Sequence, residues 1–286
     1  MLPSIVIGFI LSNPAGLQQS IAEQMKEAGA TAVGIFFEGP EGSVFRLNAD
    51  EIFHAASTMK VPVMMQVFRD VENGRLKLDQ PVAVKNQFSS IIDGSLFSLQ
   101  REEDDDPKFH DYIGQSIPLR TLVEHMINRS SNLATNIVIE LVSADRVRQL
   151  MSEIGAQDMT VLRGVEDIKA YEAGKNNTTS ARAFALCLKA ILDPKRFSEP
   201  SRAAMMEILR SQQFTDGIPA GIEAIKRNLR VANKTGEITE ISHDGAIIQN
   251  ARGQTWILVV LTRGVPTFEK GRSFVAALAN VIWNQQ

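Results

Sequence analysis

Ser57 and Lys60 stand three residues apart in Ser57-Thr58-Met59-Lys60, a serine–lysine spacing that occurs once in the chain. On a helix this spacing places both side chains on one face, so the amine can reach the hydroxyl. A serine hydroxyl is a weak nucleophile, and an adjacent desolvated or charge-flanked amine can activate it for attack on a carbonyl carbon. The start of a helix also offers backbone N–H groups to a developing oxyanion. The pair predicts acyl transfer; the alternative is that Ser57 caps the helix and Lys60 is solvated.

A second polar motif, Ser130-Ser131-Asn132, lies between two apolar helical patterns, where a turn projects side chains instead of burying them. The Ser130 hydroxyl can pass on a proton, and the Asn132 amide offers a donor and an acceptor to a substrate amide. The alternative interpretation is a polar helix N-cap.

A third motif, Lys234-Thr235-Gly236-Glu237, ends a strand-like run. Glycine lets a bound molecule approach the backbone closely, and strand edges bind extended amides. Lys234 supplies positive charge, and the Thr235 hydroxyl can hydrogen-bond a carboxylate. The alternative is a strand-end turn with a solvated lysine.

The elements that must position these motifs follow from the hydrophobic pattern. Leu17, Ile21 and Met25 predict a first amphipathic helix that ends at Gly29. Further helices are predicted at 57–72, 119–126, 134–141, 144–154, 180–191, 201–210 and 268–283. Strands are predicted at 31–37 and 43–47, joined as a hairpin, and at 230–234, 245–249 and 255–261.

Strands near both ends of the chain enclose a long helical block, which predicts an α+β fold. We expect residues 1–52 and 213–286 to form an α/β lobe with one mainly antiparallel sheet, and residues 53–212 to form an all-α lobe. The lobes would make one catalytic unit, with the site in the cleft between them.

Together the three motifs, in this order and on these element types, resemble the class A β-lactamase-like branch of the serine penicillin-recognising enzymes. The resemblance extends from about Leu17 to the final helix and includes Leu133-Ala134-Thr135-Asn136-Ile137. It implies a five-stranded antiparallel sheet flanked by the N- and C-terminal helices, with an inserted helical domain. It also implies hydrolysis of a β-lactam through a serine acyl-enzyme.

The resemblance implies a role for each matched residue. Ser57 would be acylated by the opened lactam, with Lys60 as the base or its partner. Ser130 would pass a proton to the lactam nitrogen, and Asn132 would bind a substrate amide.

The strand-end motif would bind the substrate from the other side of the reacting bond. Lys234 and Thr235 would hold the substrate carboxylate, and the backbone N–H groups of Ser57 and Glu237 would form the oxyanion hole.

Hydrolysis also needs a carboxylate that activates water to clear the acyl-enzyme. The tract 163–172 is similar to the Ω-loop of the family, and Glu166 is the candidate base. Glu166 comes three residues after Arg163, where the family has two, and is followed by Asp167 where the family has proline. Glu166 would otherwise be a solvated loop acid, with Asp167 or Glu172 facing the site instead.

Other departures concern residues around the motifs. Ser131 stands where the family usually has aspartate, and Lys169 lies near the place of an asparagine that helps to hold the water. Asn177 replaces the acid that pairs with the arginine opening the Ω-loop, so we expect no ionic clasp there. His243 and Asp244 occupy the region of an arginine that assists carboxylate binding, which predicts weak affinity for common penicillins.

Several polar features favour ordinary structural roles. The acidic run 102–106 is expected to be a solvated loop, His110 and Asp111 an exposed loop pair, and Cys187 a small core residue. The chain has neither a GxGxxG nor a Walker motif, and its histidines have no metal-binding spacing, so no cofactor and no metal are expected. The four histidines are His54, His110, His125 and His243.

The composition is that of a globular protein: 286 residues, 44% hydrophobic and 22% charged, with a net charge of −3. This charge argues against nucleic acid or an anionic membrane as a partner. No apolar run reaches the roughly 18 residues of a membrane span, so membrane insertion is not expected. The expected partner is a small-molecule β-lactam or peptidoglycan-like substrate, bound by a monomer.

The compartment is less clearly indicated. The resemblance implies a periplasmic or secreted enzyme, although the short apolar segment 5–11 has no preceding lysine or arginine and a poor cleavage site, so a cytoplasmic protein is the alternative.

Two functional alternatives remain open. The same fold serves a penicillin-binding D-alanyl-D-alanine peptidase, or an esterase or amidase of another target. The second alternative is a non-catalytic binding domain.

Overall fold

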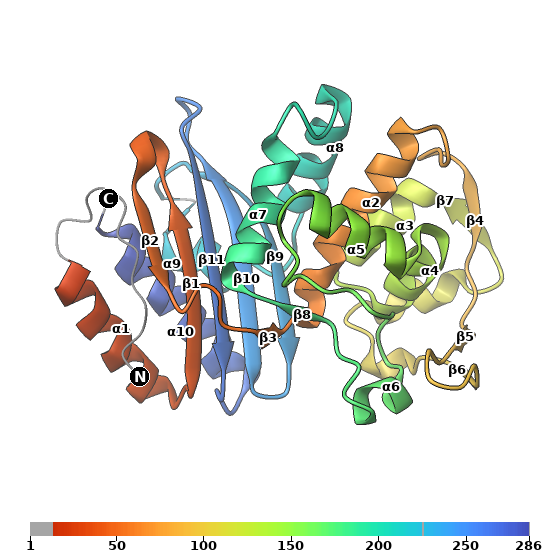
Figure 1. Ribbon diagram of the computed structural model, residues 1–286, viewed down its shortest axis with the longest axis horizontal. Helices are drawn as coiled ribbons and strands as arrows, with labels where there is room; N and C mark the ends of the chain where they lie inside the picture. Colours follow the sequence, from red (N-terminus) through yellow and green to blue (C-terminus); the bar gives the residue numbers. More distant parts are fainter. Residues whose placement is uncertain (1–13, 225, 286) are drawn as a thin grey trace. The chain divides into compact units, whose positions relative to one another are not determined.

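The computed structural model describes residues 14–224 and 226–285 and divides the chain into two compact units (Figure 1). We call residues 1–58, 179–189 and 214–286 the sheet unit, and residues 59–178 and 190–213 the helical unit. The apolar segment 5–11 lies outside the described residues. No helix within the described ranges is long and apolar enough to cross a membrane.

The sheet unit is built on five antiparallel strands in the order β2-β1-β11-β10-β9. Strand β1 lies between its hairpin partner β2 and β11 from the far end of the sequence, with Ala32 opposite Arg263. This arrangement confirms the expected five-stranded antiparallel sheet and the predicted first hairpin. The strands are β1 (Ala32–Glu38), β2 (Val44–Leu47), β9 (Arg230–Ile238), β10 (Ile241–Gln249) and β11 (Thr255–Arg263).

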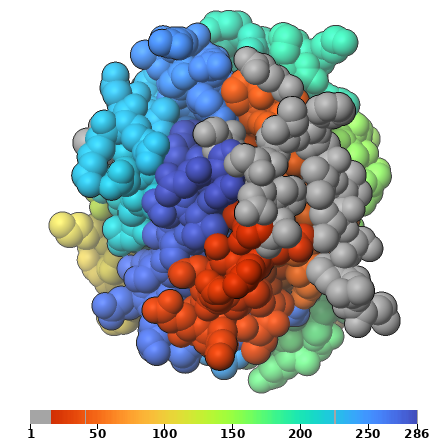
Figure 2. Space-filling model, turned by 90° about the vertical axis from the view of Figure 1, so that its left-hand side faces the viewer, coloured from red at the N-terminus to blue at the C-terminus, as the bar shows by residue number. Residues whose placement is uncertain are grey.

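Helices α1 (Pro14–Ala28) and α10 (Phe268–Trp283) lie side by side on one face of this sheet (Figure 1). Figure 2 looks onto that face, where α10 (dark blue) runs beside α1 (red). The four-residue spacing of Leu17 and Ile21 points both side chains of α1 at the sheet, where they are buried with Leu278 of α10. The short helix α9 (Ile218–Gly221) contacts α10.

Helix α2 (Lys60–Glu72) is the central element of the helical unit, packed against α3, α4, α5 and α8. Ten of its thirteen residues are buried, including the polar Gln66 and Asp70. A 3₁₀ turn at Ala56–Met59 precedes it, so the predicted helix 57–72 begins later as an α-helix. The other helices are α3 (Leu119–Asn128), α4 (Asn132–Val142), α5 (Ala144–Glu153), α6 (Ile168–Glu172), α7 (Ala181–Leu192), which the unit boundary divides, and α8 (Glu199–Arg210).

Short elements occupy the segments between these helices, chiefly between α2 and α3, where none had been predicted. The short strands are β3 (Phe53–His54), β4 (Pro81–Ala83), β5 (Phe88–Ser89), β6 (Leu96–Phe97), β7 (Ser116–Pro118) and β8 (Thr178–Thr179). The 3₁₀ turns are η1 (Pro40–Gly42), η2 (Ala56–Met59), η3 (Arg101–Glu103) and η4 (Pro107–Tyr112).

Candidate active site

Ser57 lies in the 3₁₀ turn before α2 and is half-buried. The turn is closed at Thr58, whose backbone N–H and hydroxyl both donate to the Ala55 carbonyl, at 3.1 and 2.6 Å. The end of strand β9 passes directly against it, because a Cβ on Gly236 would lie 3.0 Å from the backbone nitrogens of both Ser57 and Thr58. Glycine therefore allows the strand and the serine turn to approach each other.

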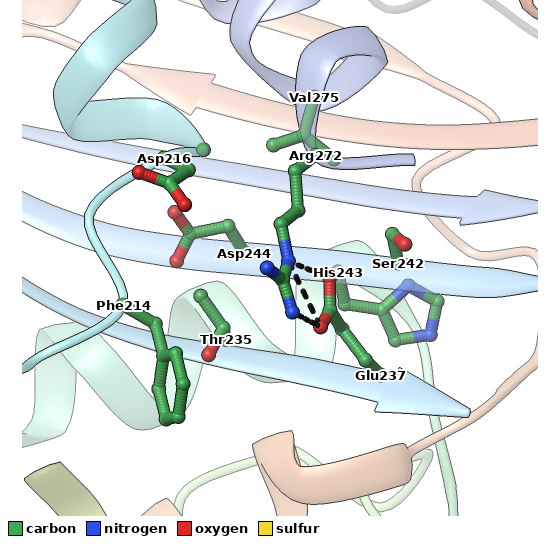
Figure 3. Close-up of a pocket in the computed structure, with 10 residues that line it drawn as sticks. Phe214, Asp216, Thr235, Glu237, Ser242, His243, Asp244, Arg272 and Val275 are labelled. Atoms are coloured by element: carbon green, nitrogen blue, oxygen red, sulfur yellow. Dashed lines mark hydrogen bonds and ion pairs between the residues drawn. The ribbon is translucent and has the colours of Figure 1, made fainter. Parts of the chain in front are cut away.

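Strand β9 also carries Lys234, Thr235 and Glu237. Lys234 is completely buried, and its Nζ donates to the Thr235 carbonyl at 2.8 Å. Thr235 and Glu237 line a pocket within the sheet unit (Figure 3). The other residues around this pocket are Phe214, Asp216, Gly217, Ser242, His243, Asp244, Arg272 and Val275.

Arg272 of α10 is a residue that sequence reasoning missed. Its guanidinium forms a two-pronged ion pair with Glu237, with Nε 2.9 Å from Oε1 and Nη2 2.7 Å from Oε2 (Figure 3). No evident counterpart of the family's carboxylate-binding arginine was expected from the sequence, and the structure places Arg272 in the pocket that Thr235 lines. Nothing local in the sequence marks Arg272, since its position depends on how α10 packs on the sheet.

His243 and Asp244, which stand in the predicted arginine region, are both buried on β10. Asp244 accepts hydrogen bonds from Asn233 Nδ2 at 3.0 Å and from the Ile218 backbone N–H at 2.9 Å. Burial raises the pKa of Asp244 to about 6, against the effect of these hydrogen bonds. The carboxylate thus ties β10 to β9 and to the start of α9.

Lys60, the first residue of α2, is fully buried in the helical unit. Its Nζ donates to the Ser130 carbonyl at 2.5 Å and to Asn132 Oδ1 at 2.9 Å, and lies 3.2 Å from Ser130 Oγ. Burial lowers the pKa of Lys60 to about 8, although the nearby carboxylates act to raise it. A fraction of the amine is therefore neutral near pH 7, as a general base requires.

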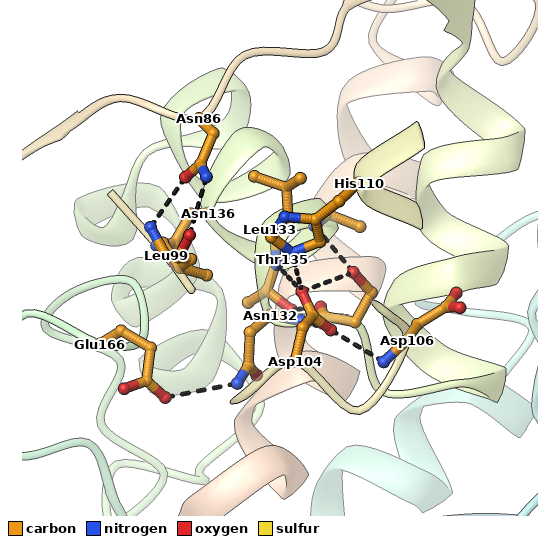
Figure 4. A network of polar contacts seen from close by, with 12 residues as sticks. Asn86, Leu99, Asp104, Asp106, His110, Asn132, Leu133, Thr135, Asn136 and Glu166 are labelled. Atoms are coloured by element: carbon orange, nitrogen blue, oxygen red, sulfur yellow. Dashed lines mark hydrogen bonds and ion pairs between the residues drawn. The ribbon is translucent and has the colours of Figure 1, made fainter. Parts of the chain in front are cut away.

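The Ser130-Ser131-Asn132 motif forms the entry to α4. Ser131 is the N-cap, with its hydroxyl accepting from the Ala134 backbone N–H at 3.2 Å. The Asn132 amide contacts two other candidates. Its Oδ1 accepts from Lys60, and its Nδ2 lies 3.3 Å from Glu166 Oε1 (Figure 4). Lys60, the Ser130–Asn132 motif and Glu166 are thus brought together from three separate parts of the sequence.

The three candidate acids of the Ω-loop-like tract have different surroundings. Glu166 is half-buried and has a positive φ of 61°. Burial and the charge of Glu103 raise its pKa, while Lys60 acts in the opposite direction. Asp167 is buried as the N-cap of α6, and Glu172 is exposed.

The carboxylate of Asp167 is used to hold the loop. It accepts from Ser90 Oγ at 2.8 Å, from the Ile91 backbone N–H at 2.9 Å and from the Ala170 backbone N–H at 3.2 Å. Lys169, on the exposed side of α6, forms an ion pair with Asp93 at 2.6 Å.

The Asn177 side chain, which follows the tract 163–172, binds the backbone at the start of this tract. Its Oδ1 accepts from the Leu162 backbone N–H at 2.8 Å, and its Nδ2 donates to the Arg163 carbonyl at 3.0 Å. The Arg163 guanidinium donates to the carbonyls of Gly164 and Lys175, at 2.9 and 3.0 Å. Hydrogen bonds to amide and carbonyl groups thus join the two ends of the tract, in place of the ion pair that the resemblance implies for the family.

Two expectations about the preceding loop were wrong. Asp104 and Asp106 of the run 102–106 are buried, whereas Glu102, Glu103 and Asp105 are exposed. His110 is also buried and lies 3.2 Å from the Asp104 carboxylate, so it does not form an exposed pair with Asp111. The alternation of buried and exposed acids depends on contacts with residues that are distant in the sequence. It therefore cannot be predicted from the neighbouring residues of the acidic run.

Among the residues that the structure describes, no group of three or more histidine, cysteine, aspartate or glutamate side chains is arranged to hold a metal ion.

Comparison with known proteins assigns the chain to a protein family. The model of the β-lactamase enzyme family matches residues 16–286. The chain belongs to this family. The curated relatives include the VEB-1 β-lactamase of Pseudomonas aeruginosa, 20% identical over 92% of this chain and 88% of the relative. The PER-1 extended-spectrum β-lactamase of the same organism is 24% identical over 87% of this chain and 80% of the relative.

Solved structures agree with this assignment. A β-lactamase from Sphaerobacter thermophilus superposes with a TM-score of 0.79 at 25% identity, covering 94% of this chain and 96% of that one. PBP-A has the same fold, with a TM-score of 0.78 at 21% identity over 95% and 96% of the two chains. These structures confirm the expected α+β fold, and the family match confirms the expected enzyme class, a serine β-lactamase-type hydrolase.

Proposed function

We propose that this β-lactamase family member opens the β-lactam amide through an acyl-enzyme on Ser57 and then hydrolyses that intermediate with Glu166. The observation that carries the proposal is the Asn132 amide, which contacts both the buried amine of Lys60 and the carboxylate of Glu166. A general base for acylation and a general base for deacylation thus adjoin one substrate-binding side chain.

Acylation begins at Ser57. The neutral Lys60 amine takes the hydroxyl proton as Ser57 Oγ bonds to the lactam carbonyl carbon. Ser130 gives its hydroxyl proton to the lactam nitrogen as the C–N bond breaks, and its Oγ then takes from Lys60 Nζ, 3.2 Å away, the proton that Lys60 had accepted. The backbone N–H groups of Ser57 and Glu237 stabilise the oxyanion, a role consistent with the close approach of Gly236 to the serine turn.

Substrate binding is assigned to the β9 motif and to Asn132. Lys234 supplies a fixed positive charge, and Thr235 lines the pocket of the sheet unit. They hold the substrate carboxylate, and Asn132 binds the substrate amide.

Deacylation is assigned to Glu166. Asp167 is occupied by the hydrogen bonds that anchor the loop, and Glu172 is exposed, whereas Glu166 contacts Asn132. Glu166 takes a proton from water as the water oxygen attacks the ester carbonyl carbon. The bond between that carbon and Ser57 Oγ then breaks, and the proton passes to Ser57 Oγ, which restores both residues.

A penicillin-binding D-alanyl-D-alanine peptidase is the second candidate. The observation that favours it is the altered Ω-loop tract, in which Glu166 follows Arg163 by three residues and has a positive φ. One structural neighbour is a mutant of PBP-A in an acyl-enzyme complex with penicillin G. A poorly placed Glu166 would leave such an adduct intact in this chain as well.

We further propose that the chain acts as a monomer in the periplasm or after secretion. Light scattering would test the oligomeric state, and cell fractionation would test the compartment.

Incubation with benzylpenicillin, followed by intact mass and by loss of the drug, separates these functions. Rapid drug loss with a transient adduct supports the β-lactamase. A stable adduct supports the penicillin-binding alternative. If neither occurs, the substrate assignment is wrong.

Replacing Ser57 identifies the nucleophile. The Ser57→Ala variant is expected to form no covalent adduct with benzylpenicillin, because it lacks the attacking hydroxyl. Circular dichroism should show that the variant keeps the wild-type fold. Labelling of this variant at another residue would overturn the assignment.

A further inference from the structure

The side chain of Asp104 is completely buried at the beginning of α4, although it comes from a loop far upstream in the sequence. Its Oδ1 accepts from the Asn132 backbone N–H at 3.0 Å, and its Oδ2 accepts from the Leu133 backbone N–H at 2.8 Å (Figure 4). These two N–H groups belong to the first turn of α4, where no helical carbonyl is available to them. The carboxylate therefore binds the helix at the residue that carries the Asn132 amide.

Further donors hold the carboxylate itself in place. The Asp106 backbone N–H donates to Oδ1 at 2.9 Å, and Ser131 Oγ donates to Oδ2 at 3.3 Å. The buried His110 ring lies with Nε2 3.2 Å from Oδ2. A buried acceptor surrounded by donors in this way has little freedom to move.

We propose that Asp104 is a positioning residue that fixes Asn132, and through its amide the relative placement of Lys60 and Glu166. The proposal rests on the function assigned above. The backbone of Asn132 is held by Asp104, while its side chain contacts Lys60 Nζ at 2.9 Å and Glu166 Oε1 at 3.3 Å. Movement of Asn132 would alter its contacts with both bases.

The identity of residue 131 explains why a distant carboxylate is needed. Ser131 is neutral, and its hydroxyl caps only the Ala134 N–H while donating to Asp104. The negative charge that favours a helix N-terminus therefore comes from residue 104. An aspartate at 131 would supply this charge locally, but beside Asp104 it would place two carboxylates close together.

The Asp104→Asn variant tests the proposal, because its amide keeps the shape of the side chain but puts an N–H group where an acceptor is needed. We expect its acylation rate with benzylpenicillin, per folded molecule, to fall between about 10-fold and 100-fold, the loss typical of a displaced catalytic group. The matched control is Asp106→Asn, which removes a buried carboxylate of the same loop that binds His125. The control should lose stability but acylate at nearly the wild-type rate.

Rescue distinguishes positioning from a general loss of stability. Ser131→Asp alone should slow acylation through repulsion, whereas the Asp104→Asn/Ser131→Asp double variant should recover most of the lost rate. Equal rates for Asp104→Asn and the wild type, a loss no larger than that of Asp106→Asn, or failure of the double variant to recover would each overturn the proposal. If Asp104→Asn does not fold, Asp104→Glu replaces it, with Asp106→Glu as its control.

A measurement without drug keeps this inference separate from the proposed function. The side-chain amide NMR signals of Asn132 should move in Asp104→Asn, return in the double variant and stay in place in Asp106→Asn. Unmoved signals in Asp104→Asn refute positioning, even if the wild type hydrolyses penicillin. Failure of the wild type to react refutes the proposed function, while the NMR result still decides the role of Asp104.

Discussion

Lys60 and Glu166 contact the two ends of one amide group, and burial shifts their pKa values in opposite directions. The pKa of Lys60 falls to about 8, while that of Glu166 rises. Both shifts favour the neutral form of each side chain, because both charges are costly away from water. Only the neutral fraction of the Lys60 amine can accept a proton in acylation, and only the ionised form of Glu166 can act as a base in deacylation.

Glu166→Gln removes the proposed deacylating base and keeps Ser57, Lys60 and Ser130, the residues proposed for acylation. Turnover of benzylpenicillin is expected to fall by about 10²–10⁴-fold, the usual contribution of a general base, and the acyl-enzyme should accumulate. Intact mass and steady-state hydrolysis would measure both effects. Unchanged turnover would redirect attention to Asp167 or Glu172.

Glu237→Gln removes the negative charge that forms the two-pronged ion pair with Arg272. The KM for an anionic penicillin should fall several-fold, since the Glu237 carboxylate no longer offsets the charge of Arg272 beside Thr235 and no longer repels the substrate carboxylate. The proposed oxyanion contact uses only the backbone of residue 237, so kcat should change little. Arg272→Ala is the matched variant and should raise KM; a lower KM in Arg272→Ala would contradict this account.

The candidate residues predicted from the sequence belong to short motifs, and residues whose contacts arise from tertiary packing were not singled out. Ser57, Lys60 and Lys234 are recognisable because neighbouring residues form a pattern. Asp104 and Arg272 reach the site only through tertiary packing, so no local periodicity identifies them.

Strand β10 carries a buried histidine whose hydrogen bonds define its protonation state. His243 Nε2 donates to the His54 carbonyl at 2.9 Å, and the Thr262 backbone N–H donates to Nδ1 at 3.1 Å. A proton on Nδ1 would face that N–H group. Burial lowers the pKa of His243 to about 4 from its ordinary 6.5, so the ring is neutral in the folded protein.

His243→Gln should make the sheet unit less stable near neutral pH, and the difference from wild type should shrink in acid. The folded pKa is below the unfolded one, so the contribution of His243 is complete above pH 6.5 and is lost as the pH falls toward 4. The difference in free energy of unfolding should change by on the order of 3 kcal/mol over this range. Urea unfolding at several pH values measures it, and a constant difference would refute the assignment.

Regular helices were predictable because their apolar spacing repeats over several turns. The predicted ranges 119–126, 144–154 and 201–210 match α3, α5 and α8 to within a few residues. Between α2 and α3 the strands are only two or three residues long, too short for any period to be visible. Their backbone pairing depends on residues that are distant in the sequence.

Cys187 is the only cysteine of the chain and is fully buried in α7. Burial raises the pKa of its thiol, so both access and reactivity are suppressed in the native protein. We expect a thiol reagent to label it at least about 10³-fold more slowly than in urea, at a rate set by opening of the sheet unit. Cys187→Ser is the control and should not be labelled; native labelling at the rate of a free thiol would show that this part of the core is open.

The pairing of β1 with β11 also determines when the sheet can form during synthesis. Ala32 is translated long before its partner Arg263. Until β11 has been made, β1 can pair only with β2, and an isolated two-stranded hairpin is marginally stable in water. In the cell the complete sheet can therefore form only after β11 has been made, and a ribosome that stalls before β11 leaves β1 as an exposed apolar strand for chaperones to protect.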